Sequence, residues 1–571
     1  MHGRMRVVVS VFRSAFENPV LVKVGFAYFF FYGAECGMWI ALIIFAYGHG
    51  GSTASMVMML VELLPCVALA PFVGALADRR RPTRMLCVGY GAQSAVMVGV
   101  SVAIAVKVPA DVVFALAPLT TLTFMVTRPT HAALLPAIVR TPGELTAANV
   151  MGGWAEGGSS LVGPVVVGVM VTWRGVALAV LSMAGLTFIS MVLVVSVIGR
   201  STVVSPNRNA AELDTTRDKA GVVRRLSTWR ATWAAVRSRT WATVTTTLRH
   251  PQMRTLLLLQ TFYFALMGSL DFLCVILAVE YLHMGRGGAG FLNAGVGGGA
   301  LVAGFFTAFL VGRRYIANTM MLNLALSVAS LAVICATRRL GPVMLLLGAV
   351  GMFGAVFSVT AQTLLQRCAP SDSIAGSFSI LEALLNVGLA IGAILVRLAL
   401  AVGGIKMALL TPAVIGFALT LGLWRQLRKI DVAATVPQVE VRLLRSIPFF
   451  AALPAPSIEA LARGVETMRE PSGTVVFTEG DFGDCYYAVA DGELTVTRAG
   501  RVVQELVRGG GFGELALIRE VPRQATVTAT TDVLLFRIAK EPFIEVLTGY
   551  ARASAAAEEV IIGYSNDEDT E

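Results

Sequence analysis

Long apolar segments recur through about the first three quarters of the chain, and this recurrence constrains the fold more than any other feature. A bilayer hydrocarbon core about 30 Å thick requires about 20 apolar residues in each helix that crosses it. The apolar segments predict twelve membrane spans, at 22–46, 53–76, 84–106, 111–135, 148–171, 175–198, 254–281, 288–311, 316–337, 341–366, 377–401 and 405–424. With 56% hydrophobic and only 14% charged residues, the composition excludes an ordinary soluble globule.

Basic residues between these segments predict the orientation, because Lys and Arg are retained on the cytoplasmic side of a membrane. Loops on one side contain groups of basic residues such as Arg79 to Arg81, whereas loops on the other side contain mostly single ones. Both termini are therefore predicted to be cytoplasmic, in a multi-pass protein of the cell membrane. The pair Arg338 and Arg339 is the exception, since it falls on the predicted outer side.

The net charge differs between the two parts of the chain. Residues 441–571 carry 12 basic and 20 acidic side chains, a net charge of −8, whereas residues 1–440 carry +18. Positive loops beside anionic lipid account for this basic excess. The lipid bilayer is therefore the expected partner of the basic part, and nucleic-acid binding is not expected.

The order of these features predicts two six-helix halves followed by a soluble domain. Residues 199–253 are rich in Ser, Thr and Arg and separate the first six spans from the last six. After residue 440 the pattern changes to short alternating apolar runs, which predict β-strands at 474–477, 486–489, 493–497 and 533–538. The predicted parts are a first half at 1–198, a basic cytoplasmic linker at 199–253, a second half at 254–424, a linker at 425–440, an α+β domain at 441–563 and an acidic tail at 564–571.

One short motif lies between the second and third predicted spans. The sequence Gly74-Ala-Leu-Ala-Asp78-Arg79-Arg80-Arg81 combines small residues, which let two helices approach closely, with charges that can join neighbouring helix ends. It resembles the loop signature of the major facilitator superfamily, although Arg81 and Pro82 stand where that family often has Gly and a basic residue. The resemblance implies that Gly74, Asp78 and Arg79 belong to a gating loop.

Further segments resemble the drug- and siderophore-exporter-like members of that superfamily. They are Arg128 to Pro136 with Thr146 to Asn149, Gly163-Pro164, and Gln362 to Arg367. The resemblance covers nearly all of residues 20–424. It implies an all-α bundle of two six-helix halves that exports a small solute by alternating access.

Six charged residues fall inside the predicted spans, namely Glu35, Glu62, Arg128, Glu156, Asp271 and Glu382. A charge at the centre of a membrane helix costs about 2.5 to 3.5 kcal/mol on insertion scales, so these side chains should face a cavity or a partner. One interpretation is a proton relay or substrate contact, with Arg128 as the counter-charge to carboxylates. The alternative is a set of static ion pairs.

Other chemistry finds no support in the sequence. The motif GxxxxGK[ST] does not occur, so a gradient is expected to drive transport. None of the seven cysteines forms a CxxC or Cys/His pattern, and the five histidines belong to no nucleophile-base arrangement. Neither a metal site nor an enzyme is therefore expected.

The most specific motif lies in the predicted soluble domain. Phe512-Gly-Glu-Leu-Ala-Leu517 is followed, after five residues, by Arg523-Gln-Ala-Thr-Val-Thr-Ala529. Glycines here let backbone N–H groups approach an anion, Arg523 can form a fork-shaped contact to phosphate oxygens, and the Glu514 carboxylate can accept from a ribose hydroxyl. The motif resembles the phosphate-binding cassette of cyclic nucleotide-binding domains, which have a jelly-roll β-barrel. The implied ligand residues are Gly513, Glu514, Leu515, Ala516, Arg523, Gln524 and Ala525.

The resemblance to this domain extends over about residues 441–550. Glu479 to Asp484 and Gly492 match its strand-turn pattern, with Phe477 and Ala488 as departures. The family tends to have Thr after the arginine with cyclic GMP and Ala with cyclic AMP, and Gln524 leaves the choice open. Cyclic AMP is the default as the commoner bacterial messenger. The aromatic candidates for stacking on the base, or for simple helix packing, are Tyr550 and Tyr564.

Together these features predict a secondary active transporter of a small solute, proton-coupled and regulated by a cytosolic cyclic nucleotide. The alternative is a membrane-tethered cyclic nucleotide receptor that no longer transports and signals to a partner. The intramembrane carboxylates argue against that alternative, since a tether has no need of them. A transcription regulator is not expected, because only 21 residues follow Tyr550 and a helix-turn-helix domain needs more.

Overall fold

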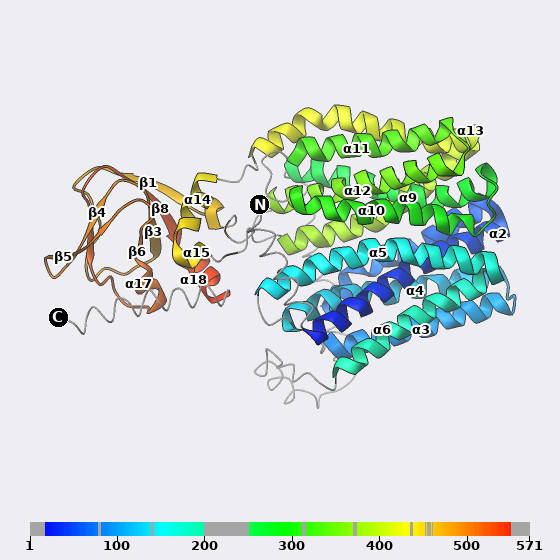
Figure 1. Cartoon of the computed structure of the whole chain (residues 1–571), viewed down its shortest axis with the longest axis horizontal. Coiled ribbons are helices and arrows are strands. Elements are labelled where there is room, and N and C mark those ends of the chain that lie inside the picture. The colour runs from blue at the N-terminus through cyan, green and yellow to red at the C-terminus, as the bar shows by residue number, and fades with distance from the viewer. Residues whose placement is uncertain are drawn as a thin grey trace, which may run out of the picture. The chain divides into compact units, whose positions relative to one another are not determined.

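The computed structural model describes residues 18–77, 82–138, 142–198, 251–310, 316–368, 374–433, 438–451, 453, 458 and 461–549. The chain divides into two compact units, Met1–Ala434 and Thr435–Glu571. Helices make up the described part of the first unit, and strands with short helices make up that of the second (Figure 1).

The first unit contains long helices, which fall into two groups separated by residues 199–250. The first half consists of α2 (Pro19–Ala77), α3 (Pro82–Ala105), α4 (Ala110–Ile138), α5 (Pro142–Arg174) and α6 (Val176–Ile198). The second half consists of α9 (Pro251–Ile276), the π-helix η1 (Leu277–Tyr281), α10 (Gly288–Leu310), α11 (Ile316–Val333), the 3₁₀ turn η2 (Ile334–Ala336), α12 (Leu340–Cys368) and α13 (Ile374–Ala433). Four of these helices begin with proline, whose fixed φ and missing N–H suit the first helical position.

Helices α2 and α13 each contain a pair of glycines with non-helical torsions. In α2, Gly50 has φ −153° and Gly51 has φ +60°, and in α13 the corresponding values are −150° at Gly403 and +65° at Gly404. The chain turns back at the first pair, since the Ser55 hydroxyl donates to the carbonyl of Ile43 at 3.2 Å. Both pairs lie at the boundaries expected between consecutive spans.

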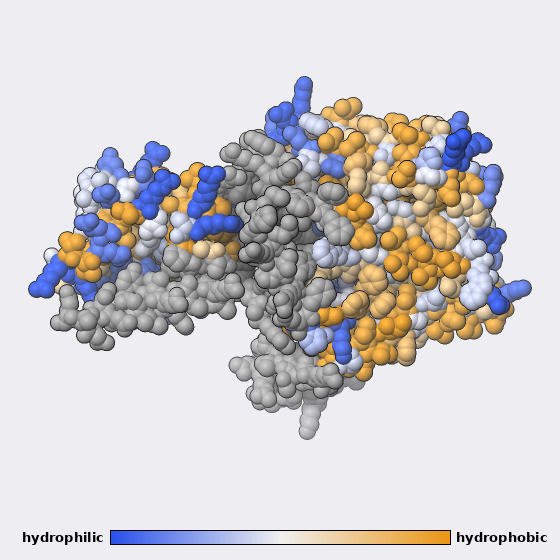
Figure 2. Space-filling model, viewed as in Figure 1, coloured by the Kyte–Doolittle hydropathy of each residue, from blue (hydrophilic) through white to orange (hydrophobic). Residues whose placement is uncertain are grey.

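Eight helices within the described residues are long and apolar enough to cross a membrane. Two of them, Pro19–Val67 and Ala383–Ile430, contain the glycine pairs. Large apolar side chains such as Leu345, Val402 and Leu421 are exposed, and Figure 2 shows hydrophobic residues over the visible face of this unit. An apolar surface of this kind suits contact with lipid. The count of twelve spans stays a prediction.

Glycines let the two halves pack closely where α5 meets α10. A Cβ at Gly290 would lie 2.4 Å from the carbonyl oxygen of Pro164, and one at Gly297 would lie 2.2 Å from that of Ser160. Neither position can accept a larger residue without a shift of backbone. Small residues thus bring one helix of each half into backbone contact, as in other membrane helix pairs.

The range expected as a second linker, 425–440, is partly helical. Helix α13 continues to Ala433, and α14 (Gln438–Ser446) begins after residues 434–437, which lie outside the described part. The division between the two units falls within the same range, after Ala434. Basic residues 425, 428 and 429 are therefore part of α13.

The second unit is a pair of four-stranded antiparallel sheets with strand orders β1-β8-β3-β6 and β2-β7-β4-β5. The strands are β1 (Glu466–Glu470), β2 (Val475–Phe477), β3 (Cys485–Asp491), β4 (Leu494–Arg498), β5 (Arg501–Leu506), β6 (Gly511–Phe512), β7 (Thr526–Ala529) and β8 (Val533–Ala539). The helices are α14, α15 (Pro448–Ala451), α17 (Glu514–Ile518) and α18 (Lys540–Gly549).

Alternation along β3 divides its side chains between two hydrophobic clusters. Tyr486 and Ala488 pack with residues of α14 and α15 and with Phe543 of α18, whereas Tyr487 and Val489 pack with residues of the second sheet. Successive side chains of a strand point to opposite faces, so one strand serves both clusters. The four runs predicted as strands correspond to β2, β3, β4 and β8, and the runs at 474–477 and 493–497 begin one residue before β2 and β4.

Candidate functional site

Arg523 is a buried cation of the second unit, with only 4% of its surface exposed. Its Nη1 donates to the carbonyl of Gly513 at 2.8 Å, and its Nη2 donates to the carbonyl of Cys485 at 2.7 Å. Its backbone is paired as well, since its N–H donates to the Asp481 carbonyl and its own carbonyl accepts from Gly480, both at 2.8 Å. The predicted turn at 479–484 and the predicted arginine are therefore held together.

Aromatic rings cover the guanidinium of Arg523. Its Cζ lies 4.2 Å from the ring centroid of Phe477 and 5.9 Å from that of Tyr487. Phe512 stacks on Tyr487, with ring centroids 5.2 Å apart. Burial lowers the pKa of Arg523 from its ordinary value, and the ring faces and carbonyl dipoles compensate part of the cost of burying the charge. Phe477, a departure from the family pattern, thus has a contact that explains its size.

Two glycines have no side chain, and the guanidinium of Arg523 occupies the space that a side chain would fill. A Cβ at Gly483 would lie 2.8 Å from Cζ of Arg523, and one at Gly513 would lie 2.5 Å from Nη1. Gly513 also has φ +92°, in the left-handed region that favours glycine. Both positions therefore require glycine if Arg523 is to keep this place.

The other predicted ligand residues lie beside Gly513 or beside Arg523. Glu514 is the first residue of α17 and is 5% exposed, and Ala516 in the same helix is also buried. Leu515 and Ala525 are half-buried. Gln524 is exposed, and its Nε2 donates to the Pro522 carbonyl at 2.9 Å. Tyr550 and Tyr564 lie outside the described residues.

Sequence reasoning missed a second arginine that supports the site. Nε of Arg537 in β8 donates to Sγ of Cys485 at 3.0 Å, and its Nη2 lies 3.0 Å from Oδ2 of Asp484. The Cys485 carbonyl in turn accepts from Arg523. Burial is the main cause that raises the pKa of the Cys485 thiol, while Arg537 lowers it in part. No local sequence motif indicates Arg537, because its contact with Cys485 depends on the pairing of β3 with β8.

In the first unit, Arg128 and Glu156 come together as a polar group with Tyr28. The Tyr28 hydroxyl donates to Oε1 of Glu156 at 2.6 Å, and Nη2 of Arg128 lies 4.0 Å from the same oxygen. The side chains of Arg128 and Glu156 are 33% and 38% exposed. His131, buried, stacks on Tyr28 with ring centroids 4.1 Å apart. Tyr28 and His131 were not among the predicted residues, since neither carries a fixed charge.

The structure separates Glu35 and Glu62 from that group. Nε2 of Gln93 donates to Oε2 of Glu35 at 3.0 Å. Thr121 donates to Oε2 of Glu62 at 3.4 Å, and within the described residues Oε1 of Glu62 has no hydrogen-bond partner. Glu62 is 1% exposed, so its carboxyl is one of the most enclosed polar groups described.

Asp271 joins the two halves. It accepts a hydrogen bond from Nε1 of Trp39 in α2 at 3.0 Å. Two further contacts link α2 to the second half: the Tyr47 hydroxyl donates to Glu280, and Nε of Arg397 donates to the Thr53 hydroxyl at 2.9 Å. Tyr47 and Thr53 lie beside the turn of α2 at Gly50 and Gly51, whereas Trp39 lies about 16 Å along the helix before it.

Three predicted residues cannot be placed in this network. Glu382 belongs to α13, but its side chain is outside the described part, and Asp78 and Arg79 lie outside it altogether. Gly74 lies in α2. Among the side chains that the structure describes, no group of three or more His, Cys, Asp or Glu could hold a metal ion.

Two family profiles match the chain. The Major Facilitator Superfamily profile matches residues 24–335, and the cyclic nucleotide-binding domain profile matches residues 468–550. The second range contains Arg523, Gly513 and the aromatic rings described above.

The following curated relatives match a stretch of about 106 residues of this chain. The cAMP-dependent protein kinase regulatory subunit of Yarrowia lipolytica is 39% identical over 106 residues, which is 18% of this chain and 28% of the relative. That of Eremothecium gossypii is 40% identical over 105 residues, 18% of this chain and 23% of the relative. The chain thus spans about a quarter of the length of these relatives.

One solved structure resembles the helical unit. A POT family transporter, crystallised with a thioalcohol-conjugated peptide, superimposes with a TM-score of 0.55 at 15% identity. The match covers 72% of this chain and 96% of that one. At this identity the likeness concerns the fold alone.

Proposed function

The chain belongs to the major facilitator superfamily and carries a cyclic nucleotide-binding domain, and from this premise we propose that it is a proton-coupled exporter of a small solute, regulated by cyclic AMP. The direction of transport follows from the resemblance of its motifs to drug- and siderophore-exporter-like members. The coupling ion and the nucleotide rest on the residues discussed below.

The observation that carries the transport proposal is the polar group of Tyr28, Arg128 and Glu156. These side chains lie on helices that belong to the membrane part, yet about a third of Arg128 and Glu156 is exposed. Charged side chains at such positions are costly in lipid, and they are retained where they face a substrate or ion pathway. A solute that contacts this group meets an arginine, a carboxylate and a phenol hydroxyl together.

Contacts between the halves support alternating access. Tyr47–Glu280 and Thr53–Arg397 join the halves beside the glycine turn of α2, and Trp39–Asp271 joins them deeper in the bundle. A rocking movement that separates these helices has to break all three. Protonation of Asp271 replaces a charge-assisted hydrogen bond with a weaker neutral one, which favours opening. This is the step at which we place the proton coupling.

Arg523 supports nucleotide binding. A guanidinium has five N–H donors, and two of them are used by the carbonyls of Gly513 and Cys485. The remaining donors can bind the oxygens of a cyclic phosphate. Glu514, at the start of α17, is the acceptor for the ribose hydroxyl. The curated relatives named above are cAMP-dependent proteins, and this favours cyclic AMP over cyclic GMP.

Regulation requires that the nucleotide bind one transport state better than the other. Couplings of this kind are typically about 1 to 3 kcal/mol, or roughly 5- to 150-fold in affinity. The chain between α13 and α14 connects the two units, and we propose that it transmits the coupling.

Nucleotide binding is tested by titrating the purified full-length protein with cyclic AMP and cyclic GMP in a calorimeter. We expect saturable binding, tighter for cyclic AMP, and its loss in Arg523→Ala. Equal affinity for the two nucleotides would contradict the proposal that cyclic AMP is the ligand. Absence of binding to both would contradict regulation by a cyclic nucleotide.

Transport is tested in proteoliposomes with an imposed pH gradient and a panel of drug-like and siderophore-like solutes. We expect pH-driven movement of at least one solute, and a change of its rate on addition of cyclic AMP. Intact nucleotide binding without movement of any solute would favour the membrane-tethered receptor instead.

A further inference from the structure

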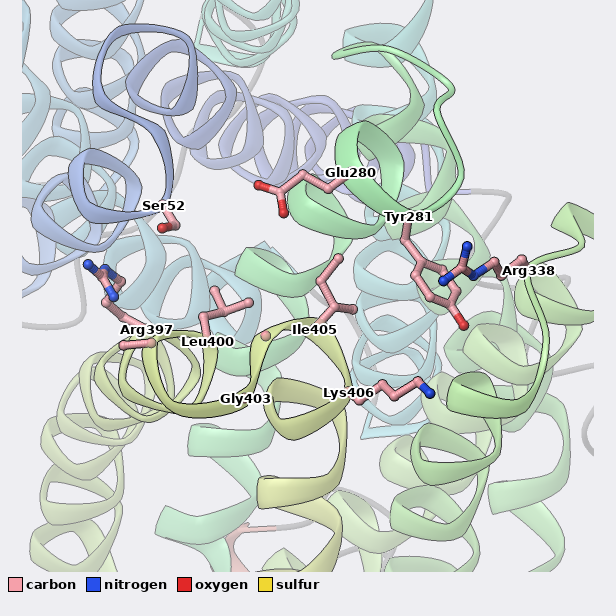
Figure 3. Close-up of a pocket in the computed structure, with 11 residues that line it drawn as sticks. Ser52, Glu280, Tyr281, Arg338, Arg397, Leu400, Gly403, Ile405 and Lys406 are labelled. Atoms are coloured by element: carbon pink, nitrogen blue, oxygen red, sulfur yellow. The ribbon is translucent and has the colours of Figure 1, made fainter.

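Two acids of the first half, Glu35 and Glu62, have no basic partner within the described residues. Other acids of the helical unit differ from them. Glu156 lies beside an arginine, and the Asp271 carboxylate accepts from an indole. Glu280 lines a cavity together with three basic residues (Figure 3), namely Arg338, Arg397 and Lys406. An uncompensated carboxylate is costly in a membrane interior, so Glu35 and Glu62 need a partner of another kind.

The two acids and their polar neighbours Gln93 and Thr121 lie at a similar depth in the first half. Glu62 lies about 16 Å along the helix after the glycine turn of α2, and Glu35 lies about 22 Å before it. Thr121 lies about 16 Å from the start of α4, and Gln93 lies about 18 Å from the end of α3. Since the loop between α3 and α4 is predicted to lie on the same side of the membrane as the glycine turn, the four residues fall in one layer about 6 Å deep.

Contacts link these four side chains, which we call the inner carboxylate group. Nε2 of Gln93 donates to Oε2 of Glu35 at 3.0 Å, and the Thr121 hydroxyl donates to Oε2 of Glu62 at 3.4 Å. Glu35 and Glu62 are close enough to interact electrostatically, and both act on the thiol of Cys66, one turn after Glu62. The two hydrogen-bonded pairs therefore belong to one site, in which two negative charges repel each other.

The polar atoms without a partner in this group are both acceptors. Glu62 is 1% exposed and Gln93 is fully buried, and among the described residues neither Oε1 has a hydrogen-bond partner. The Gln93 oxygen shares a carbon with the nitrogen that donates to Glu35, so it lies beside that carboxylate. Buried polar atoms nearly always have a partner. Here the missing partner has to be a donor or a cation, because an anion would add a third negative charge.

The chemistry of the ligand atoms favours a small monovalent cation. All of them are oxygens, from carboxylates, an amide and a hydroxyl, which suit hard cations. Calcium takes 6 to 8 oxygen ligands and magnesium usually retains several waters. Few oxygens are available here, and Met59, Met97 and Ala117, one turn away along α2, α3 and α4, belong to the hydrophobic core. Glu35 is only half-buried, so a cation can reach the site past its carboxylate.

We propose that the inner carboxylate group binds one sodium ion. The carboxylates of Glu35 and Glu62 and the amide oxygen of Gln93 are its ligands, and the lone pairs of the Thr121 hydroxyl provide another. Because all four side chains come from α2, α3 and α4, the ion stabilises the packing of the first half. It joins no residue of the second half. This proposal does not depend on the transported solute, on the nucleotide or on protonation of Asp271.

The test is thermal unfolding of the purified full-length protein in detergent, at constant ionic strength and pH. Sodium chloride is compared with the chlorides of potassium, calcium and N-methylglucamine. A ligand that binds only the folded state raises the unfolding temperature, so we expect a saturable increase with sodium that the other cations do not reproduce. Equilibrium binding of radioactive sodium to the same protein should show one ion for each chain.

Variants connect this response to the site. Glu62→Gln should be at least as stable as wild type without sodium, because it removes a buried charge, and its unfolding temperature should no longer respond to sodium. Gln93→Leu should weaken sodium binding at least tenfold. Asp111→Asn, at the exposed start of α4, is the matched control and should respond like wild type.

Folding and competing explanations are controlled separately. Elution as a single species and an unchanged helical circular dichroism spectrum identify folded variants, and Thr121→Val replaces Glu62→Gln if the latter misfolds. Stabilisation by lower pH without any response to sodium would assign the two carboxylates to protons and overturn the proposal. A response to calcium in place of sodium, or an unchanged sodium response in the folded variants, also overturns it.

Discussion

The indole of Trp39 and the carboxylate of Asp271 are hydrogen-bonded across the boundary between the two helical halves, 3.0 Å from Nε1 to Oδ2. Trp39 is in α2, and Asp271 is in α9, so the bond has to break if these two helices separate. Its loss or retention is therefore a direct probe of which state the protein occupies.

Trp39→Phe should destabilise the state described here, because it leaves the Asp271 carboxylate without its indole donor. A hydrogen bond to a charged group contributes about 1.5 to 3 kcal/mol. A double-mutant cycle with Asp271→Asn, measured by thermal unfolding in detergent, should show that the two effects are not additive. Trp173→Phe, at an exposed site, is the control and should be neutral. Strict additivity would show that the bond contributes nothing.

Arg523→Lys should bind cyclic nucleotide at least tenfold more weakly than wild type, even though it retains the positive charge. A lysine cannot donate at the same time to the carbonyls of Gly513 and Cys485 and to a phosphate, because it lacks the planar fork. Calorimetry measures the affinity, and Arg501→Lys in the exposed strand β5 is the matched control. Wild-type affinity in Arg523→Lys would contradict this assignment of its role.

Gly513→Ala and Gly500→Ala form a matched pair that separates two effects. Both glycines have positive φ, at +92° and +81°, so each substitution carries a backbone cost of about 1 to 2 kcal/mol. Only a Cβ at position 513 meets Arg523, whereas nothing lies within 4 Å of one at 500. Thermal unfolding should therefore show a larger loss for Gly513→Ala, accompanied by weaker nucleotide binding. Equal losses of stability in the two variants would mean that the Arg523 guanidinium moves away from the added Cβ at no cost.

Glu156→Gln should reduce solute flux at least tenfold, since it removes the charge that faces Arg128 while it keeps the size of the side chain. Tyr28→Phe should have a smaller effect, because it removes one hydrogen bond and no charge. Flux into proteoliposomes is the measurement, and Asp111→Asn at an exposed helix start is the control. Unaltered flux in Glu156→Gln would remove this carboxylate from the pathway.

Ionisation of the Cys485 thiol should make the second unit less stable at alkaline pH. Burial raises the pKa of the thiol above its ordinary value of 9.0, so the folded protein binds the proton more tightly than the unfolded chain. The resulting stability is complete below the unfolded pKa and is lost as pH rises through the folded pKa. Urea unfolding of the second unit at pH 7 and pH 10 should show this loss. Cys485→Ala should reduce it, and an identical pH dependence in that variant would assign the loss to other groups.

Local sequence patterns predicted much of the fold. The glycine pairs fell at the predicted span boundaries because two glycines can adopt torsions that other residues avoid. Strands β2, β3, β4 and β8 were found from their alternation. Strands β1, β5, β6 and β7 were missed: β5 is exposed and has no apolar face, β6 has only two residues, and β1 and β7 are short.

The candidate sites were predictable only in part. Arg523 and Gly513 are recognisable because they stand at fixed spacing in one motif. Arg537 and Trp39 depend on partners 52 and 232 residues away, so no local pattern indicates them. The same is true of Arg338 and Arg397, which are distant in sequence and line one cavity only through the packing of the second half.

The paired glycines at 50–51 and 403–404 join two helical segments directly, with no loop residues between them. Two consecutive helical segments are thus joined within two residues at each pair, and the torsions of these glycines set the angle between the segments. An epitope inserted at either glycine pair has no existing loop to extend, so it would have to unwind helix on both sides.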